Sequence, residues 1–197
     1  MPGLRLRHRG LTLIELMVVV ALIVVVIALA APSFKQTVER QRVSSTNAQL
    51  VTDMQFARSE AATRNQHVRV TFASNSSMSC YVIYTYNMSV AGSLSRCNCL
   101  VDPACTAAGS TEIRVVRIPR DTSVAVLPQS GMPIEFAFEP LTGALYKIPT
   151  DFFSPPLAQY AAQTQIDSQR TLRTTMGRSG RPTVCAPVGS KMQAPAC

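Results

Sequence analysis

The chain has 197 residues, and its 19 Lys plus Arg against 11 Asp plus Glu give a formal net charge of +8. Only 15% of the residues are charged and 47% are hydrophobic, whereas soluble domains usually carry about a quarter charged residues. This composition excludes collagen-like, coiled-coil and fully disordered chains, and it indicates that apolar residues are concentrated in one segment. The length allows one domain of ordinary size with an appendage.

The N-terminus holds that apolar segment. Residues 1–10 form a basic leader with three arginines and no acid, and the 21 residues Leu11–Ala31 are apolar except for Thr12 and Glu15. A helix of this length measures about 31 Å, close to the roughly 30 Å hydrocarbon core of a bilayer. We therefore expect a single transmembrane helix over 11–31, with the basic flank in the cytoplasm and the rest of the chain across the membrane.

A secretory signal peptide is the alternative interpretation, because Ala28-Leu29-Ala30 is an A-x-A site behind a positive flank. Two features oppose it. The apolar run is longer than the roughly 7 to 15 residues of a signal-peptide core, and it contains Glu15, whose lone carboxylate would cost about 2.5–3.5 kcal/mol near the bilayer centre and less near its edge. A cut between Gly10 and Leu11 would supply a compensating α-amino group in the same apolar layer.

Residues 10–15, Gly-Leu-Thr-Leu-Ile-Glu, resemble the prepilin peptidase site of type IV pilins and type II secretion pseudopilins. The resemblance implies cleavage after Gly10, N-methylation of Leu11, and a role for Glu15 in filament assembly, where it pairs with the α-amino group of a neighbouring subunit. The family usually has Phe where this chain has Leu11. Pro32 falls where such proteins carry a helix-interrupting proline, so we expect a helix break there.

The segment 32–65 is predicted to continue as an amphipathic helix, because no glycine or proline follows Pro32 within it. Glu60 and Arg64 form an i,i+4 pair in the favourable order. The apolar stripe that should face a sheet recurs at helical spacing and consists of Leu50, Met54, Ala57 and Ala61.

Residues 57–65, Ala-Arg-Ser-Glu-Ala-Ala-Thr-Arg-Asn, followed by Val68, resemble the ARSEA…RN signature of the FimT/GspH branch of minor pilins. The signature is long and specific. Its arginines, Arg58 and Arg64, are also explained by ordinary contacts of a helix with solvent or with a sheet.

Beyond Asn65 the sequence changes to short β-rich runs separated by turn residues, which favours an α+β fold with an antiparallel sheet laid on the helix. Phe138-x-Pro140-x-x-Gly143 resembles the family's middle motif and would close a hairpin. Two stretches, 89–110 and 150–163, are predicted to be a cysteine-containing loop and a second insertion or linker. The expected strands are 68–72, 80–86, 113–118, 124–127 and 134–138, within a domain spanning 66–185 and followed by a tail at 186–197.

The cysteines number six, an even count that favours disulfides and an oxidising compartment. They are Cys80, Cys97, Cys99, Cys105, Cys185 and Cys197. Six cysteines allow 15 connectivities, and the spacing does not choose among them. A metal site at Cys97, Cys99 and Cys105 is the alternative, but this spacing matches no common zinc pattern and no histidine is near. We therefore predict neither a metal nor a cofactor.

The C-terminal region from Gln169 carries five basic residues and no acid. Four are candidate DNA-binding residues: Arg170, Arg173, Arg178 and Arg181. Residues 177–181 resemble the Gly-Arg-x-Arg tail motif that is associated with DNA binding in FimT-type pilins, although here an extra residue separates the arginines. If Gly180-Arg181 is aligned instead, Thr183 replaces the second arginine. A solvated basic surface, or contact with acidic filament neighbours, explains the same residues.

Arginines on a glycine-containing loop could contact successive phosphates without reading sequence. Base stacking is not available to the tail, because no aromatic residue follows Tyr160.

An enzyme is disfavoured because the chain holds only His8 and His67 and none of the familiar catalytic motifs. The resemblances imply a type IV pilin-like minor pilin or pseudopilin. They also imply prepilin peptidase and other pilins as partners, and a bacterial inner-membrane anchor with the C-terminal domain in the periplasm before assembly. Double-stranded DNA captured for natural transformation is a further expected partner. The alternative function is that of an H-type minor pseudopilin in type II secretion.

Overall fold

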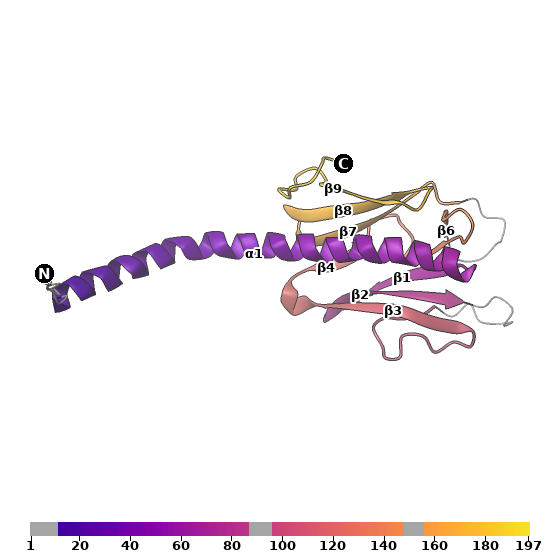
Figure 1. Cartoon of the computed structure of the whole chain (residues 1–197), viewed down its shortest axis with the longest axis horizontal. Coiled ribbons are helices and arrows are strands. Elements are labelled where there is room, and N and C mark those ends of the chain that lie inside the picture. Colours follow the sequence, from indigo (N-terminus) through magenta and orange to yellow (C-terminus); the bar gives the residue numbers. More distant parts are fainter. Residues whose placement is uncertain (1–11, 87–95, 148–155) are drawn as a thin grey trace, which may run out of the picture. The chain divides into compact units, whose positions relative to one another are not determined.

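The computed structural model describes residues 12–86, 96–147 and 156–197, with only the backbone of 29–33. The expected leader and both residues of the cleavage site therefore lie outside the described residues. The chain divides into two compact units, 1–38 and 39–197, which are considered separately. The elements, labelled in Figure 1, are α1 (Leu13–Arg64), β1 (Val68–Ser74), β2 (Met78–Tyr86), β3 (Ser110–Pro119), the 3-10 turn η1 (Arg120–Thr122), β4 (Ala125–Pro128), β5 (Glu135–Phe138), β6 (Leu145–Lys147), β7 (Gln159–Asp167), β8 (Arg170–Gly177) and β9 (Pro182–Cys185).

Both ends of α1 are capped by local sequence. At the start, the backbone N–H of Glu15 donates to Thr12 Oγ1 at 3.3 Å, half of a capping box. At the end, Asn65 adopts a left-handed φ of 50°, and the N–H of Gln66 donates to the carbonyl of Ala61 at 3.2 Å. This is a Schellman-type stop with asparagine in the position that favours a left-handed residue.

The expected helix break at Pro32 is wrong. Pro32 lies inside α1, which continues without interruption to Arg64. Proline lacks an N–H and removes one hydrogen bond from the helix, but the glycine-free sequence on either side sustains the helical backbone through it.

In the first unit, the side chains of α1 from 13 to 28 are exposed and largely apolar. The large ones between 13 and 27 are Leu13, Ile14, Leu16, Met17, Val18, Val19, Val20, Leu22, Ile23, Val24, Val25, Val26 and Ile27. No helix of the described chain is long and apolar enough to cross a membrane. The expected transmembrane span therefore stays a prediction.

In the second unit, the strands form two antiparallel sheets. One has the order β3-β2-β1-β5-β6 and the other β4-β7-β8-β9. All five strands expected from the sequence are present, and the 138–143 motif joins β5 to β6 in a hairpin as expected. The linker expected over 150–163 is wrong at its end, because Gln159 begins β7. Three further strands, β6, β8 and β9, were not expected.

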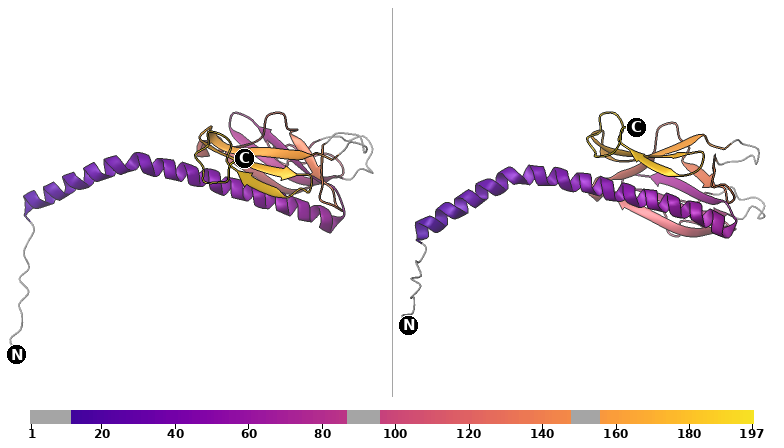
Figure 2. Two further views of the ribbon diagram at one scale, coloured as in Figure 1. Left: turned by 90° about the horizontal axis from the view of Figure 1, so that it is seen from above. Right: turned by 45° about the horizontal axis from the view of Figure 1, so that its top comes forward.

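One core joins the helix to both sheets. The expected stripe, Leu50, Met54, Ala57 and Ala61, is buried and packs with residues of both sheets. The two alanines allow strands to approach the helix closely. Figures 1 and 2 show the C-terminal part of α1 running alongside the strands of both sheets. The expected α+β architecture, a helix on antiparallel sheet, is confirmed.

Strand β2 is buried on both faces, because a second cluster covers the face that turns away from the helix. The cysteine-containing loop expected within 89–110 is held against β2 by the disulfide Cys80–Cys99 and is closed on itself by Cys97–Cys105. The pairing uses the thiols that a metal site would need, so the alternative of a cysteine metal site is wrong.

Candidate functional site

The residues predicted to act in processing and assembly lie in two groups. Gly10 and Leu11 are outside the described residues, and nothing in the structure bears on their cleavage or methylation. Glu15 is described and exposed, in the first turn of α1 beside the exposed apolar side chains of the first unit. Among the described residues the Glu15 carboxylate forms no ion pair or hydrogen bond, and the backbone N–H of Glu15 donates to Thr12 Oγ1.

The four candidate DNA-binding arginines do not form one patch. In a strand, residues an odd number apart face opposite sides of the sheet. Arg170 and Arg173 both belong to β8, so they point to opposite faces. Arg170 faces the helix, where it forms ion pairs with Glu39 and Asp167, and its Nε donates to Asp167 Oδ2 at 3.0 Å. Arg170 is therefore neutralised and is not available to a phosphate.

Arg173 faces away from the helix and is half-buried. Its Nε is buried and has no hydrogen-bond partner among the described residues. Its strand neighbours on that face are polar, since Thr175 Oγ1 and Thr183 Oγ1 share a hydrogen bond of 2.8 Å. Arg173 thus contributes positive charge to the outer face of the second sheet.

Arg178 and Arg181 are the arginines best placed to meet a ligand. Both are exposed in the turn between β8 and β9, and neither forms an ion pair or hydrogen bond within the described residues. The turn is ordered internally, because the N–H of Gly180 donates to the carbonyl of Gly177 at 2.9 Å. This arrangement can present two forked cations to an anionic polymer.

The segment predicted as a C-terminal tail, 186–197, is held against the rest of the second unit. Cys185 and Cys197 form a disulfide, and Ala186 bridges Ala196 in parallel. The closed loop is fastened to the start of β8, where the N–H of Lys191 donates to the carbonyl of Gln169 at 2.7 Å. All six predicted cysteines are therefore in disulfides, and the last pair holds the C-terminus in place.

Two buried carboxylates were missed in the sequence. Asp53 of α1 is 1% exposed, accepts a 2.6 Å hydrogen bond from the Tyr81 hydroxyl, and lies 3.2 Å from Arg114 Nε. Burial and then the Asp53 hydrogen bond raise the pKa of Tyr81 far above its ordinary value, so this hydroxyl stays a donor. The only sequence signal for the burial of Asp53 was its position in the helical pattern, on the side that faces the sheet.

The second is Glu135, also 1% exposed. It accepts from Tyr84 at 2.5 Å and from Arg96 Nε at 2.7 Å, and Arg69 Nη1 lies 3.8 Å away. Burial and then the negative charge of Glu135 raise the pKa of Tyr84 to about 12. Each carboxylate is buried, accepts a tyrosine hydroxyl and pairs with an arginine, although Asp53 Oδ1 has no hydrogen-bond partner among the described residues.

No cluster of three or more His, Cys, Asp or Glu side chains within the described ranges is arranged to hold a metal ion. Two open hollows of the described surface, of about 340 and 620 Å³, do not touch the arginine turn. The smaller is lined by helix residues and by residues around η1, including Arg42, Arg117 and Asp121.

Comparison with known proteins gives two family matches. Residues 46–180, more than half of the chain, match the family described as type II transport protein GspH. Residues 5–31 match the prokaryotic N-terminal methylation motif. The search of curated proteins and the search of solved structures gave no significant match.

Proposed function

The chain belongs to the GspH family and carries a prokaryotic N-terminal methylation motif, which makes it a minor pilin or pseudopilin, and from this premise we propose that it is a structural subunit of a type IV pilus-type filament and not an enzyme. Prepilin peptidase would remove residues 1–10 and expose the α-amino group of Leu11. The apolar residues of the first unit would then pack among those of other subunits.

The observation that carries this proposal is the combination of the methylation motif with the exposed apolar segment 13–27 of α1, which contains one acid. In an apolar filament core, an unpaired carboxylate is costly, and pairing with a cation recovers much of that cost. Glu15 and the α-amino group of Leu11 on a neighbouring subunit would satisfy each other. Before assembly, the same segment would anchor the protein in the inner membrane, with the second unit in the periplasm.

Substitution of Glu15 tests the assembly step. Glu15→Ala should abolish incorporation into sheared filaments, measured by immunoblot against the amount of protein in the membrane fraction. Glu60→Ala is a matched control, because Glu60 is an acid of the same helix whose partner is Arg64 at 2.6 Å. Equal incorporation of the Glu15 variant and the parent would refute the proposed pairing.

Processing has its own measurement. Mass spectrometry of the N-terminus should find a chain that begins at Leu11 and carries one added methyl group. A chain that begins after Ala30 would instead support the secretory signal peptide.

Contact with double-stranded DNA is the second part of the proposal, and the exposed turn carries it. Arg178 and Arg181 have no acidic partner in the described structure, and no acid lies between Gln169 and Cys197. Arg170 is not among the proposed DNA contacts, because its guanidinium forms ion pairs with Glu39 and Asp167. Two arginines predict a slope of log K against log salt of about −1.8, with a steeper slope if Arg173 also reaches a phosphate.

Binding can be measured with the full chain in a neutral detergent and a mixed-sequence duplex. Replacing Arg178 and Arg181 by Ala should weaken binding and flatten the salt slope. Lys191→Ala controls for the loss of a positive charge elsewhere in the C-terminal region, because Lys191 lies in the loop at the opposite end of β8. Unchanged binding in the double variant would assign the turn to structure.

Membership of a type II secretion system is the alternative, and the description of the matching family favours it. The exposed arginine turn favours a pilus, since a secretion tip has no evident need for phosphate contacts. Neighbouring genes distinguish the two: other minor pilin genes would indicate a pilus, and a general secretion operon would indicate the pseudopilus.

A further inference from the structure

Gly180 is buried although the residues on both sides of it are exposed. Its φ is +68°, and a Cβ there would lie 2.2 Å from the carbonyl oxygen of Gly143 and 3.1 Å from the ring of Phe138. No side chain fits in that space. The turn between β8 and β9 therefore lies directly on the turn between β5 and β6.

The supporting turn is itself firmly held. The N–H of Gly143 donates to the carbonyl of Glu139 at 2.9 Å, and the Glu139 carboxylate accepts from the N–H groups of Leu141 at 3.1 Å and Thr142 at 2.8 Å. Gly143 has a φ of +70°. A Cβ at this position would lie 2.4 Å from Arg58 Nε, so the guanidinium of α1 is in direct contact with the turn.

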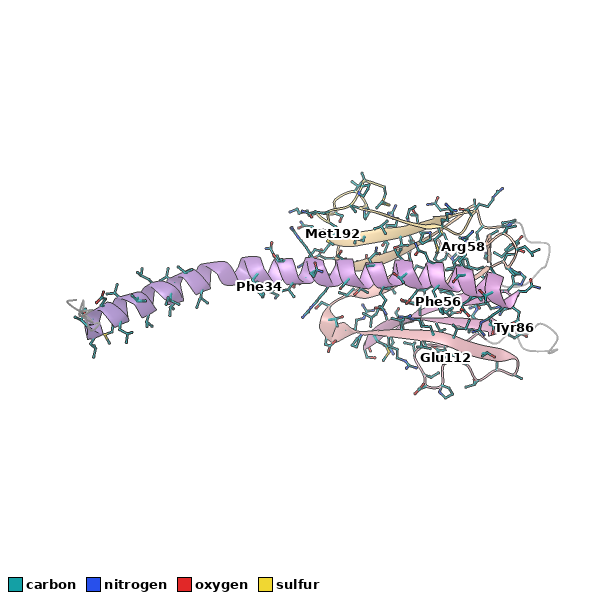
Figure 3. All side chains as sticks on the ribbon, viewed as in Figure 1. Phe34, Phe56, Arg58, Tyr86, Glu112 and Met192 are labelled. Carbon is teal, nitrogen blue, oxygen red and sulfur yellow. A yellow bond between two sulfur atoms is a disulfide. The ribbon has the colours of Figure 1, made fainter. Side chains whose placement is uncertain are left out.

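Arg58 is placed by this contact more than by hydrogen bonds. Its Nη2 donates to the carbonyl of Thr142 at a long 3.4 Å, and its buried Nε has no hydrogen-bond partner among the described residues. Figure 3 labels Arg58 on the C-terminal part of α1. Three motifs far apart in the sequence, on α1, on the β5–β6 hairpin and on the β8–β9 turn, thus meet at one point.

We propose that Arg58, Gly143 and Gly180 are positioning residues that hold the turn of Arg178 and Arg181 ready for its anionic ligand. This inference rests on the proposed DNA contact. A turn that is already ordered does not lose backbone freedom on binding, whereas a loose turn of four residues, 178–181, must be ordered by the ligand. Loosening the support is therefore expected to weaken DNA binding about 5- to 30-fold without removing either arginine.

Gly180→Ala tests the contact directly, and Gly131→Ala is its matched control. Both glycines have a left-handed φ, +68° and +84°, so alanine introduces similar backbone strain at both. Nothing lies within 4 Å of a Cβ at Gly131. Only the Gly180 variant should lose DNA affinity, and its salt slope should flatten toward that of the double arginine variant.

Arg58→Lys provides a second, gentler perturbation in case Gly180→Ala fails to fold. Lysine keeps the positive charge but has no planar guanidinium to lie against Gly143. Hydrogen exchange of the turn amides, measured on the full chain without DNA, reports the support itself. The N–H of Gly180 donates to the carbonyl of Gly177. Its hydrogen exchange should be faster in Arg58→Lys than in the parent, while the midpoint of thermal unfolding stays unchanged.

The outcomes separate the two proposals. Weaker DNA binding with faster turn exchange, in the Gly180 or Arg58 variant but not in Gly131→Ala, supports the positioning role. Parental affinity and parental exchange in both variants would overturn it, even if the double arginine variant loses binding. Absence of DNA binding by the parent would refute the proposed DNA contact and, with it, the positioning of that ligand, whatever the exchange shows.

Discussion

Asn47 is the residue whose replacement should disturb the second unit most specifically. Its Oδ1 accepts hydrogen bonds from Thr164 Oγ1 at 3.0 Å and Thr174 Oγ1 at 2.9 Å, and all three side chains are at most 2% exposed. The threonines belong to β7 and β8, so one amide oxygen ties α1 to the second sheet. Asn47→Leu keeps a similar side-chain size but leaves two buried hydroxyls without their acceptor.

A buried hydroxyl that loses its partner costs about 1–3 kcal/mol, and the added apolar burial of leucine returns roughly 1 kcal/mol. Because two hydroxyls lose their acceptor, the free energy of unfolding should fall by about 1–5 kcal/mol. Adding Thr164→Val and Thr174→Val removes both unsatisfied groups, because valine has nearly the shape of threonine. This triple variant should recover to within about 1 kcal/mol of the parent.

Urea unfolding of the full chain in a mild detergent, followed by tyrosine fluorescence, measures these differences, since Tyr81, Tyr84 and Tyr160 are buried in the second unit. Comparison requires equal denaturant slopes among the variants. A triple variant as unstable as Asn47→Leu would refute the reasoning, because the loss would then come from packing and not from unsatisfied hydroxyls.

Three further predictions concern other parts of the second unit. Joint replacement of Cys185 and Cys197 by Ser should lower the unfolding free energy by about 3 kcal/mol, because the bond closes a loop with a separation of 12 residues; equal urea midpoints would contradict this. Burial lowers the pKa of His67, so the folded state binds its proton more weakly than the unfolded chain, and stability should fall as the pH drops below about 6.5; His67→Gln should remove that part of a pH series of unfolding measurements. Arg170→Ala should lower the thermal midpoint, because Glu39 and Asp167 lose their partner, and should leave DNA affinity unchanged in the binding assay.

The strands that sequence reasoning found and missed differ in their buried residues. The five expected strands bury runs such as Val68, Val70 and Phe72, which give a clear apolar signal. Strands β7 and β8 bury alanines and threonines, including Thr164 and Thr174. These threonines are satisfied by Asn47, a residue more than a hundred positions away, and no local pattern can show such a pairing.

Only part of the candidate site could be predicted, because some of its contacts also join residues far apart in the sequence. Composition and the tail motif indicated a turn with two arginines and no acid in the flanking sequence, and the structure places Arg178 and Arg181 in the turn between β8 and β9. They could not show that the turn rests on Gly143, because that contact joins residues from three separate segments. The disulfide pairing likewise could not be predicted from the sequence, since the six cysteines allow 15 connectivities.

The two sheets use arginines three residues apart in the same way. In β3, Arg114 lies 3.2 Å from the helix acid Asp53, and Arg117 on the other face donates to the carbonyls of Cys99 at 2.9 Å and Val101 at 2.7 Å. In β8, Arg170 meets the helix acid Glu39, and Arg173 faces outward. Because side chains alternate along a strand, one arginine of each pair lies against α1 and the other lies on the outer face. Had β8 been recognised as a strand, its alternation would have placed Arg170 on the same face as the apolar Leu172 and Met176, and Arg173 on the opposite face.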